Sequence, residues 1–588
     1  MRKGRTLGKT LGIAALGAAL LAACNDGGGG TSANNSTAEG SLVYNPPFRI
    51  ASLTAAALTS QLSASVSGQQ LLSLAGAPKC GVDFHLIEYT TVGGAGEATT
   101  ASGALMVPTG GTGCSGKRPM VEYAHGTATT SGYNIADITA TTNEAWNESV
   151  LIAAMYAAQG FIVVAPNYVG YDQADVATLN YHPYLNATQN AHDMMDALAA
   201  ARSALSGGLA GASDNGQLLL TGYSEGGYVA MATHKAMQAA GLPVTAAAPM
   251  SGPYATEALG DAIVFGNVDL GSTVFLPLIT ESYQKTYGNI YAQTSDVYEA
   301  AYATGIDSLL PSAQSIGTIF TTGKLPQTAL FSSTPTGLAP LDALTTAAQA
   351  NPLFALGFGS SNLIKNSVRI AYAADVFAHP DGADAGTLAA GVPLATNTAY
   401  PLRVALGKND MRSWTPNGTT PIALCGGRND PTVFYPVNTS TMLAYWQPLV
   451  GTLVTEVDTD PVTPSQTFPA GLASEVAFLA ATAAGTAIAG GATDPTVISN
   501  AALGAVITAP AFSANFSGTT PITPQGILIL GAAGVAAQVV AADVAAASTA
   551  TLGVDINNAV VQQYHGTLVP PACTYYARSF YKFVGQIQ

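Results

Sequence analysis

Three residues far apart in the sequence have the chemistry of a nucleophilic relay. Ser224 lies in the run Gly222–Gly227 (GYSEGG), between an apolar segment and a helical pattern, and Asp430 and His565 each lie in a turn-like setting. A serine hydroxyl becomes a nucleophile when a histidine removes its proton, and a carboxylate holds that histidine in the required tautomer. We therefore predict Ser224 as the nucleophile, His565 as the general base and Asp430 as the acid that orients the base.

The acid and the base each have an alternative. Asp430 lies in CGGRNDP, directly after an apolar predicted strand, whereas Asp410 in KND is the alternative acid. His565 follows a predicted last strand, Ala559–Tyr564, from which a loop histidine can reach the serine. His125 is the alternative base, although we expect it to be structural. The strained strand-to-helix turn expected at the serine is typical of functional sites and favours a nucleophile over a plain glycine-rich turn.

The segments around these residues alternate between strand and helix patterns. Predicted helices lie at 186–205 and 226–240, and predicted strands at 84–91, 104–108, 120–124, 161–166, 217–221, 244–249 and 421–425. Continuous apolar, β-branched runs are typical of strands buried on both faces. Strands that alternate with helices predict a doubly wound, mostly parallel α/β sheet. The alternation stops over 257–398, which we expect to be an inserted, mainly helical cap.

Taken together, the motifs resemble the α/β-hydrolase superfamily, and more narrowly its secretory lipase branch. They are YAHGT (123–127), VAPNYVGY (164–171), HPYL (182–185), GYSEGG (222–227), LCGGRNDPTV (424–433) and YHGT (564–567). The order serine, aspartate, histidine is the order of that superfamily. The resemblance implies hydrolysis of carboxylic esters, often of lipids, under a helical cap and with no cofactor or metal. The long connection between Asp430 and His565 departs from the family pattern.

The resemblance also implies an oxyanion hole made of two backbone N–H groups. One donor is the residue after the nucleophile, here Glu225, and the other comes from a loop after an earlier strand. That loop is the His-Gly turn in EYAHGT, which makes the second donor Thr127 or Gly126. Loss of one such donor typically lowers the rate by about 10²–10³-fold.

The N-terminus has the pattern of an export signal. A basic segment, Met1–Lys9, precedes the apolar run Leu11–Leu20 and the sequence LAAC, which ends at Cys24. The apolar run is too short to span a membrane, and the small residues before the cysteine fit a cleavage site. LAAC resembles the lipobox of bacterial lipoproteins, which predicts a lipid on Cys24; an ordinary signal peptide is the alternative. Asn25 in place of aspartate favours the outer membrane or cell surface.

Four further cysteines form an even set in an exported chain, which indicates disulfides. Cys80 and Cys114 flank a predicted hairpin, so we pair them. Cys425 and Cys573 then form the second pair. Four buried thiols are the alternative. The sequence contains no Cys-x-x-Cys, which argues against a redox dithiol or a zinc ribbon.

Composition narrows the class of partner. Asp and Glu number 35 against 20 Lys and Arg, for a net charge of −15, and charged residues make up 9% of the chain. Nucleic acid requires a basic footprint, so we expect no nucleic-acid partner. The hydrophobic share of 48% argues against a disordered polyampholyte. We expect an apolar ester as substrate and contact with a membrane only through the lipid at Cys24; the oligomeric state is left open.

The expected organisation has seven parts. They are a signal peptide (1–23), a flexible tether (24–45), a hydrolase core in three pieces (46–256, 399–460 and 552–588), the cap (257–398) and an Ala/Gly-rich insertion (461–551). The insertion is interpreted as a buried helical hairpin, with a lipid- or substrate-facing surface as the alternative. Two other functions are possible on this pattern: a serine peptidase on the same fold, and a non-catalytic surface lipoprotein that retains a relic of the fold.

Overall fold

The computed structural model describes most of the chain after the N-terminal segment. The described residues are 32–33, 38–171, 179–209, 211–384, 387–388, 394–461, 471–513, 515–516 and 523–586. The predicted signal peptide, most of the predicted tether and the predicted lipidation site Cys24 lie outside them.

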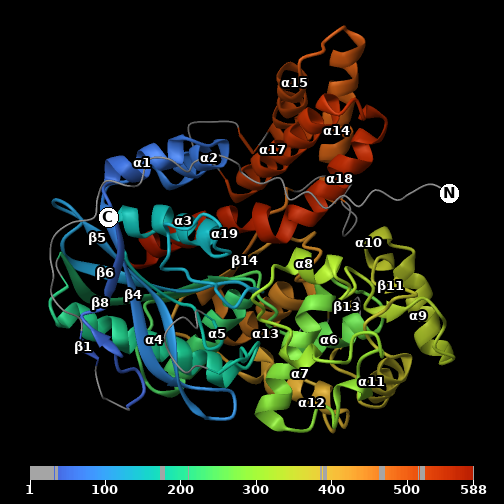
Figure 1. Cartoon of the computed structure of the whole chain (residues 1–588), viewed down its shortest axis with the longest axis horizontal. Coiled ribbons are helices and arrows are strands. Elements are labelled where there is room, and N and C mark those ends of the chain that lie inside the picture. The colour runs from blue at the N-terminus through green and yellow to red at the C-terminus, as the bar shows by residue number, and fades with distance from the viewer. Residues whose placement is uncertain are drawn as a thin grey trace.

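A sheet of nine strands forms the centre of the described part of the chain (Figure 1). Its strands are β3 (Phe48–Leu53), β4 (Gly81–Val92), β5 (Ala98–Thr109), β6 (Gly116–Ala124), β7 (Ile162–Pro166), β8 (Ala212–Tyr223), β9 (Ala246–Met250), β14 (Ile422–Gly426) and β15 (Val454–Asp458). Their order is β15-β14-β9-β8-β6-β7-β5-β4-β3. The six strands from β15 to β7 are mutually parallel, and β5, β4 and β3 continue the sheet antiparallel. The predicted mostly parallel α/β sheet is confirmed.

Helices cover both faces of the sheet. On one face lie α4 (Ala187–Ser206) and α5 (Glu225–Ala239), and on the other lie α19 (Val569–Val584) and, beside it, α3 (Trp146–Met155) (Figure 1). This coverage explains why β7 and β9 are buried along their whole length and are apolar at nearly every position. Along α19, buried residues recur every four positions, as an amphipathic helix requires: Val569, Cys573, Ala577 and Tyr581.

The region between β9 and β14 is mainly helical. It contains α6 (Thr256–Val264), α7 (Ser272–Tyr287), α8 (Ile316–Thr321), α9 (Ala339–Gln349), α10 (Pro352–Ala355), α11 (Asn366–Ala378) and α12 (Pro401–Lys408). Short strand pairs accompany these helices: β10 (Phe331–Ser332) with β11 (Phe358–Gly359), and β12 (Ala383–Asp384) with β13 (Thr387–Leu388). Outside this region lie β1 (Ser32–Ala33), β2 (Tyr44–Asn45), α1 (Ala55–Ser63), α2 (Val66–Ala75) and α13 (Thr441–Val450).

A bundle of apolar helices projects from the body in Figure 1 and is called the helical arm below. It consists of α14 (Gly471–Ala489), α15 (Pro495–Thr508), α17 (Pro524–Ala545) and α18 (Leu552–Gln563), with the short α16 (Pro510–Ser513). Among the described residues, α14 and α17 are long and apolar enough to cross a membrane, with 33% and 44% of their most apolar windows buried inside the molecule. Their buried faces pack against the other arm helices, and α17 also packs against α19, so the buried residues of the arm are continuous with the core of the body.

The predicted last strand at Ala559–Tyr564 is wrong. Residues up to Gln563 belong to α18, and Tyr564–Leu568 forms a short π-helical turn that leads into α19. The β-branched pair Val560-Val561 favours a strand locally, but Leu552, Ile556 and Val560 are buried at intervals of four residues. That spacing places all three on one face of a helix, and packing of this face within the arm overrides the local preference.

Both predicted disulfides are present. Cys80 and Cys114 connect the start of β4 to the turn between β5 and β6. Cys425 and Cys573 connect β14 to α19 across one face of the sheet. Disulfides form and persist in oxidising compartments, so both bonds agree with export of the chain.

Candidate active site

The turn that carries Ser224 is strained and closely packed. Ser224 has φ 60° and ψ −124°, between the end of β8 and the first residue of α5. A Cβ atom on Gly226 would lie 1.9 Å from the carbonyl oxygen of Ala124, and one on Gly222 would lie 2.3 Å from the carbonyl oxygen of Gly226. Only glycine fits at either position. The packing therefore holds the serine in a conformation that a free chain rarely adopts.

The three residues predicted as a relay come together at one hydrogen-bonded line. His565 Nε2 lies 2.8 Å from Ser224 Oγ, and His565 Nδ1 lies 2.6 Å from Asp430 Oδ2. The other carboxylate oxygen of Asp430 accepts the N–H groups of Thr432 and Val433 at 2.9 and 3.0 Å. The Asp430 side chain is buried, whereas 12% of the His565 side chain is exposed. The aspartate is thus fixed on both sides, and the histidine faces the serine.

Tyr223 holds the backbone of the histidine turn. Its hydroxyl donates to the carbonyl oxygen of His565 at 2.6 Å, and the two rings lie 5.1 Å apart. Burial raises the pKa of Tyr223 well above its usual value, and the nearby Asp430 raises it further. The phenol therefore stays protonated and keeps its donor role. Sequence reasoning missed this contact because a tyrosine inside a Gly-x-Ser-x-Gly run shows no sign of a partner 342 residues away.

The backbone near the serine offers two free N–H donors. Within the described part of the chain, no acceptor is found for the N–H of Glu225 or of Thr127. The N–H of Gly126 donates to Glu148 Oε1 at 3.3 Å, so between the two predicted alternatives it is Thr127 that is available. The Thr127 hydroxyl lies 2.7 Å from the hydroxyl of Tyr184, which fixes that residue's side chain.

The side chain of Glu225 points away from the serine into the core. Its Oε1 lies 2.6 Å from His182 Nε2, and His182 Nδ1 lies 3.0 Å from the carbonyl oxygen of Val169. Both side chains of the pair are fully buried. The pair anchors the first turn of α5 to the segment after β7, which places the Glu225 backbone. The sequence pattern HPYL indicated a structural turn at His182 but not this partner.

The alternative acid and base lie elsewhere. Asp410 is buried in a bidentate pair with Arg412 and accepts the N–H of Glu257 at 3.1 Å. His125 is fully buried, with Nδ1 2.6 Å from the carbonyl oxygen of Gly126 and Nε2 3.0 Å from that of Asn167. The carboxylate of Asp410 and both ring nitrogens of His125 are thus occupied by structural contacts. Among the described residues, no group of three or more His, Cys, Asp or Glu side chains could hold a metal ion.

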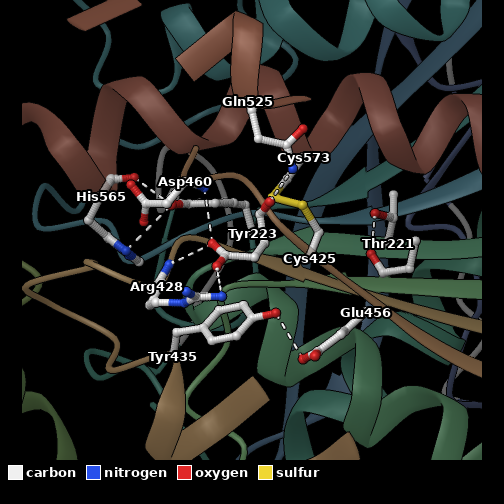
Figure 2. The surroundings of a disulfide bond; sticks show 12 residues. Thr221, Tyr223, Cys425, Arg428, Tyr435, Glu456, Asp460, Gln525, His565 and Cys573 are labelled. Carbon is white, nitrogen blue, oxygen red and sulfur yellow. Dashed lines mark hydrogen bonds and ion pairs between the residues drawn. A yellow bond between two sulfur atoms is a disulfide. The ribbon is translucent and has the colours of Figure 1, made fainter. Parts of the chain in front are cut away.

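Behind the acid loop lie a disulfide and two further carboxylates. Figure 2 shows the Cys425–Cys573 disulfide with Arg428, Asp460 and His565 on one side of it. Burial, with Asp458 close by, raises the pKa of Asp460 to about 6. Asp460 is 2% exposed and comes two residues after the end of β15. Sequence reasoning missed it, although an Asp-Thr-Asp run after a strand is a signal that could have been considered.

The region between β9 and β14 contacts the site from two directions. The N–H of Leu270 donates to the carbonyl oxygen of Pro431 at 3.0 Å, next to Asp430. On the other side, Phe275 of α7 stacks on Tyr184, with the ring centroids 6.5 Å apart. Ser224 is only 9% exposed. Residues of this region therefore lie against both the acid loop and the Thr127 side of the site.

Solved structures with a similar fold are known for two other hydrolases. No protein-family model and no curated protein matches the chain. Among solved structures, the rice cell wall degrading esterase LipA from Xanthomonas oryzae is similar, with 26% identity over 72% of this chain and 91% of that chain and a TM-score of 0.54. A putative hydrolase from Legionella pneumophila matches at 19% identity over 70% of this chain and 90% of that chain, with a TM-score of 0.50.

This chain has an α/β-hydrolase fold. In α/β-hydrolases the nucleophile lies at a sharp turn between a strand and a helix, at the carboxyl edge of the sheet. Here that place is taken by Ser224, between β8 and α5. The acid follows a later strand, as Asp430 follows β14. His565 sits in a helical turn that follows the helical arm.

Proposed function

We propose that the protein is a serine hydrolase that cleaves carboxylic esters. The observation that carries this proposal is the line of two hydrogen bonds from Asp430 through His565 to Ser224, at 2.6 and 2.8 Å. The likeness to the X. oryzae esterase supports ester hydrolysis over other uses of the fold. The spacing of the three side chains is within the range that proton transfer between them requires.

The proposed reaction has two acyl-transfer steps. His565 takes the proton of Ser224 as its oxygen attacks the ester carbonyl carbon. The N–H groups of Glu225 and Thr127 donate to the oxyanion that forms. His565 then gives the proton to the leaving alcohol, which leaves an acyl-enzyme. Water attacks the acyl-enzyme with His565 again as base, and His565 returns the proton to Ser224 Oγ as the bond to the acyl group breaks and the carboxylic acid is released. Asp430 holds the ring of His565 and stabilises the imidazolium in both steps.

The proposed substrate is an apolar ester, and the proposed location is the bacterial cell envelope. Phe275 and Tyr184 lie next to the proposed oxyanion donors, which favours an apolar acyl or alcohol group there. A lipid on Cys24 would tether the enzyme to the outer membrane or cell surface. The two disulfides agree with an oxidising compartment.

Hydrolysis of p-nitrophenyl esters from C2 to C16 tests the proposal, with Ser224→Ala as the comparison. We expect the wild type to hydrolyse part of this series and Ser224→Ala to lose at least about 10³-fold in kcat. The acyl chain length that is hydrolysed fastest indicates the size of the acyl-binding site. A fluorophosphonate probe should label the wild type and leave Ser224→Ala unlabelled. Absence of both activity and labelling would refute the proposal, and cleavage of aminoacyl or prolyl amides without esters would point to a peptidase.

A further inference from the structure

One oxygen atom of Asp460 bonds the neighbours of both the acid and the base. Asp460 Oδ2 accepts the N–H of Asn429 at 2.8 Å and also accepts the hydroxyl of Tyr564. Asn429 immediately precedes Asp430, and Tyr564 immediately precedes His565. The bonds are therefore one residue away from each end of the Asp430–His565 contact.

The surroundings of Tyr564 are shaped to admit its phenol. Tyr564 is 2% exposed, and burial raises the pKa of its hydroxyl well above the usual value, with Asp460 raising it further. A Cβ atom on Gly427 would lie 2.1 Å from the Tyr564 hydroxyl oxygen. Glycine at this position in the acid loop thus leaves the space that the phenol needs to reach Asp460.

Asp458 braces the other side of the same loop. Its Oδ1 accepts the N–H of Arg428 and the N–H of Asp460, both at 3.0 Å, and its Oδ2 lies 2.8 Å from Arg428 Nη2. The arm helix α17 also reaches this point, because Gln525 Nε2 donates to the carbonyl oxygen of Asp458 at 2.5 Å. Figure 2 shows Arg428, Gln525 and Asp460 around the disulfide. These contacts hold the segment after β15 in place independently of the two bonds that Asp460 makes.

We propose that Asp460 is a positioning residue that keeps Asp430 and His565 aligned for proton transfer. This inference rests on the proposed function. The carboxylate does not touch the reacting atoms. It bonds the backbone N–H of the residue before Asp430 and the side-chain hydroxyl of the residue before His565. The Asp430–His565 bond between them joins residues 135 positions apart in sequence. Without it, the acid loop and the histidine turn lose the one carboxylate that bonds both of them, although Tyr223 still holds the carbonyl oxygen of His565. A displacement of about 1 Å can lower a rate by about 10²-fold.

A pair of tyrosine substitutions tests the positioning role. Tyr564→Phe removes the hydroxyl that donates to Asp460. Tyr435→Phe is the matched control, because Tyr435 is also buried and donates to a carboxylate of the same region, Glu456 on β15, at 2.9 Å. We expect Tyr564→Phe to lower kcat 10- to 100-fold with KM changed less than about twofold, and Tyr435→Phe to keep both constants within about twofold.

A spectroscopic signature separates positioning from loss of structure. The proton shared by His565 Nδ1 and Asp430 gives a far-downfield ¹H NMR signal when the bond is short. We expect this signal to broaden or move in Tyr564→Phe and to stay unchanged in Tyr435→Phe. Unaltered kcat and an unaltered signal in Tyr564→Phe would overturn the inference, as would equal losses in both variants. Asp460→Asn, which keeps the shape and one acceptor oxygen, serves if Tyr564→Phe does not fold, with a smaller loss of kcat expected.

The inference and the proposed function fail in different ways. If the wild type hydrolyses no ester and no fluorophosphonate labels Ser224, the proposed function is wrong. The NMR signal of His565 still reports whether Asp460 aligns the Asp430–His565 bond. If the wild type is an esterase and Tyr564→Phe and Asp460→Asn both keep its kcat and the signal, only the positioning role is wrong.

Discussion

Tyr223 donates its hydroxyl to the backbone carbonyl oxygen of His565, so the residue before the nucleophile holds the residue that activates it. The contact joins the end of β8 to the π-helical turn after α18. The same hydroxyl lies 3.4 Å from His565 Nδ1, whereas the two ring nitrogens lie closer to Asp430 Oδ2, at 2.6 Å, and to Ser224 Oγ, at 2.8 Å. The strand β8, which positions Ser224, therefore also positions His565, independently of the hydrogen bond between the Ser224 and His565 side chains.

Tyr223→Phe should lower kcat roughly 5- to 10-fold with little change in KM, because a hydrogen bond contributes about 1 kcal/mol net. Steady-state kinetics on the preferred p-nitrophenyl ester measures the effect. Tyr254→Phe is the matched control, since Tyr254 is fully buried and its hydroxyl has no hydrogen-bond partner among the described residues. Equal kcat in the wild type and Tyr223→Phe would mean that the side-chain bonds alone hold His565.

Gly226→Ala should disrupt the backbone conformation of the turn that carries Ser224. The added Cβ would lie 1.9 Å from a backbone carbonyl oxygen, which cannot move aside as a flexible side chain can. We expect a loss of about 1–3 kcal/mol or more in the free energy of unfolding, with loss of fluorophosphonate labelling. Gly132→Ala is the control, because a Cβ there meets no atom within 4 Å. Denaturant unfolding of both variants makes the comparison, and similar stabilities would contradict it.

The two disulfides should differ in their effect on catalysis. Cys425 lies five residues before Asp430, and Cys573 eight residues after His565, so their bond spans the acid and the base. Cys425→Ser with Cys573→Ser should destabilise the fold by about 5 kcal/mol and lower kcat, since the bond closes a segment of 148 residues. The Cys80–Cys114 disulfide closes a segment of only 34 residues. Its removal in Cys80→Ser with Cys114→Ser should lower the free energy of unfolding by about 4 kcal/mol. At temperatures where both variants are folded, only the first should lose kcat.

Glu122 should make the fold less stable in alkaline solution. It is fully buried on β6, neither carboxylate oxygen has a hydrogen-bond partner among the described residues, and burial raises its pKa to about 8. The folded chain then holds a proton that the unfolded chain releases above about pH 4.5. Stability therefore falls as pH rises from about 4.5 to about 8, by on the order of a few kcal/mol.

Glu122→Gln tests this dependence. The variant has no proton to lose, so it should match the wild type near pH 5 and exceed its melting temperature at pH 9. Thermal unfolding at several pH values between these limits measures the difference. Parallel curves for the two proteins would show that Glu122 does not titrate in this range.

Short-range sequence patterns predicted the reacting residues of the site better than the residues that hold them in position. Ser224 and Asp430 were recognisable because each follows an apolar strand within a few residues. The bonds from Tyr223 to His565 and from Tyr564 to Asp460 join residues more than 100 positions apart, and no local pattern records such a partner. The strand predicted before His565 failed for the same reason, because packing in the helical arm decides that segment.

The bond between Asp460 and Tyr564 also marks where the helical arm leaves and rejoins the body. The two residues are 104 positions apart, and α14 to α18 all lie between them. The helical arm is therefore an insertion whose two ends lie next to each other, joined by the bond between Asp460 and Tyr564. Chain length within such a loop can change at little entropic cost, since each doubling adds only about 0.6 kcal/mol. Evolution can exchange, shorten or enlarge this module while the distance between acid and base stays the same.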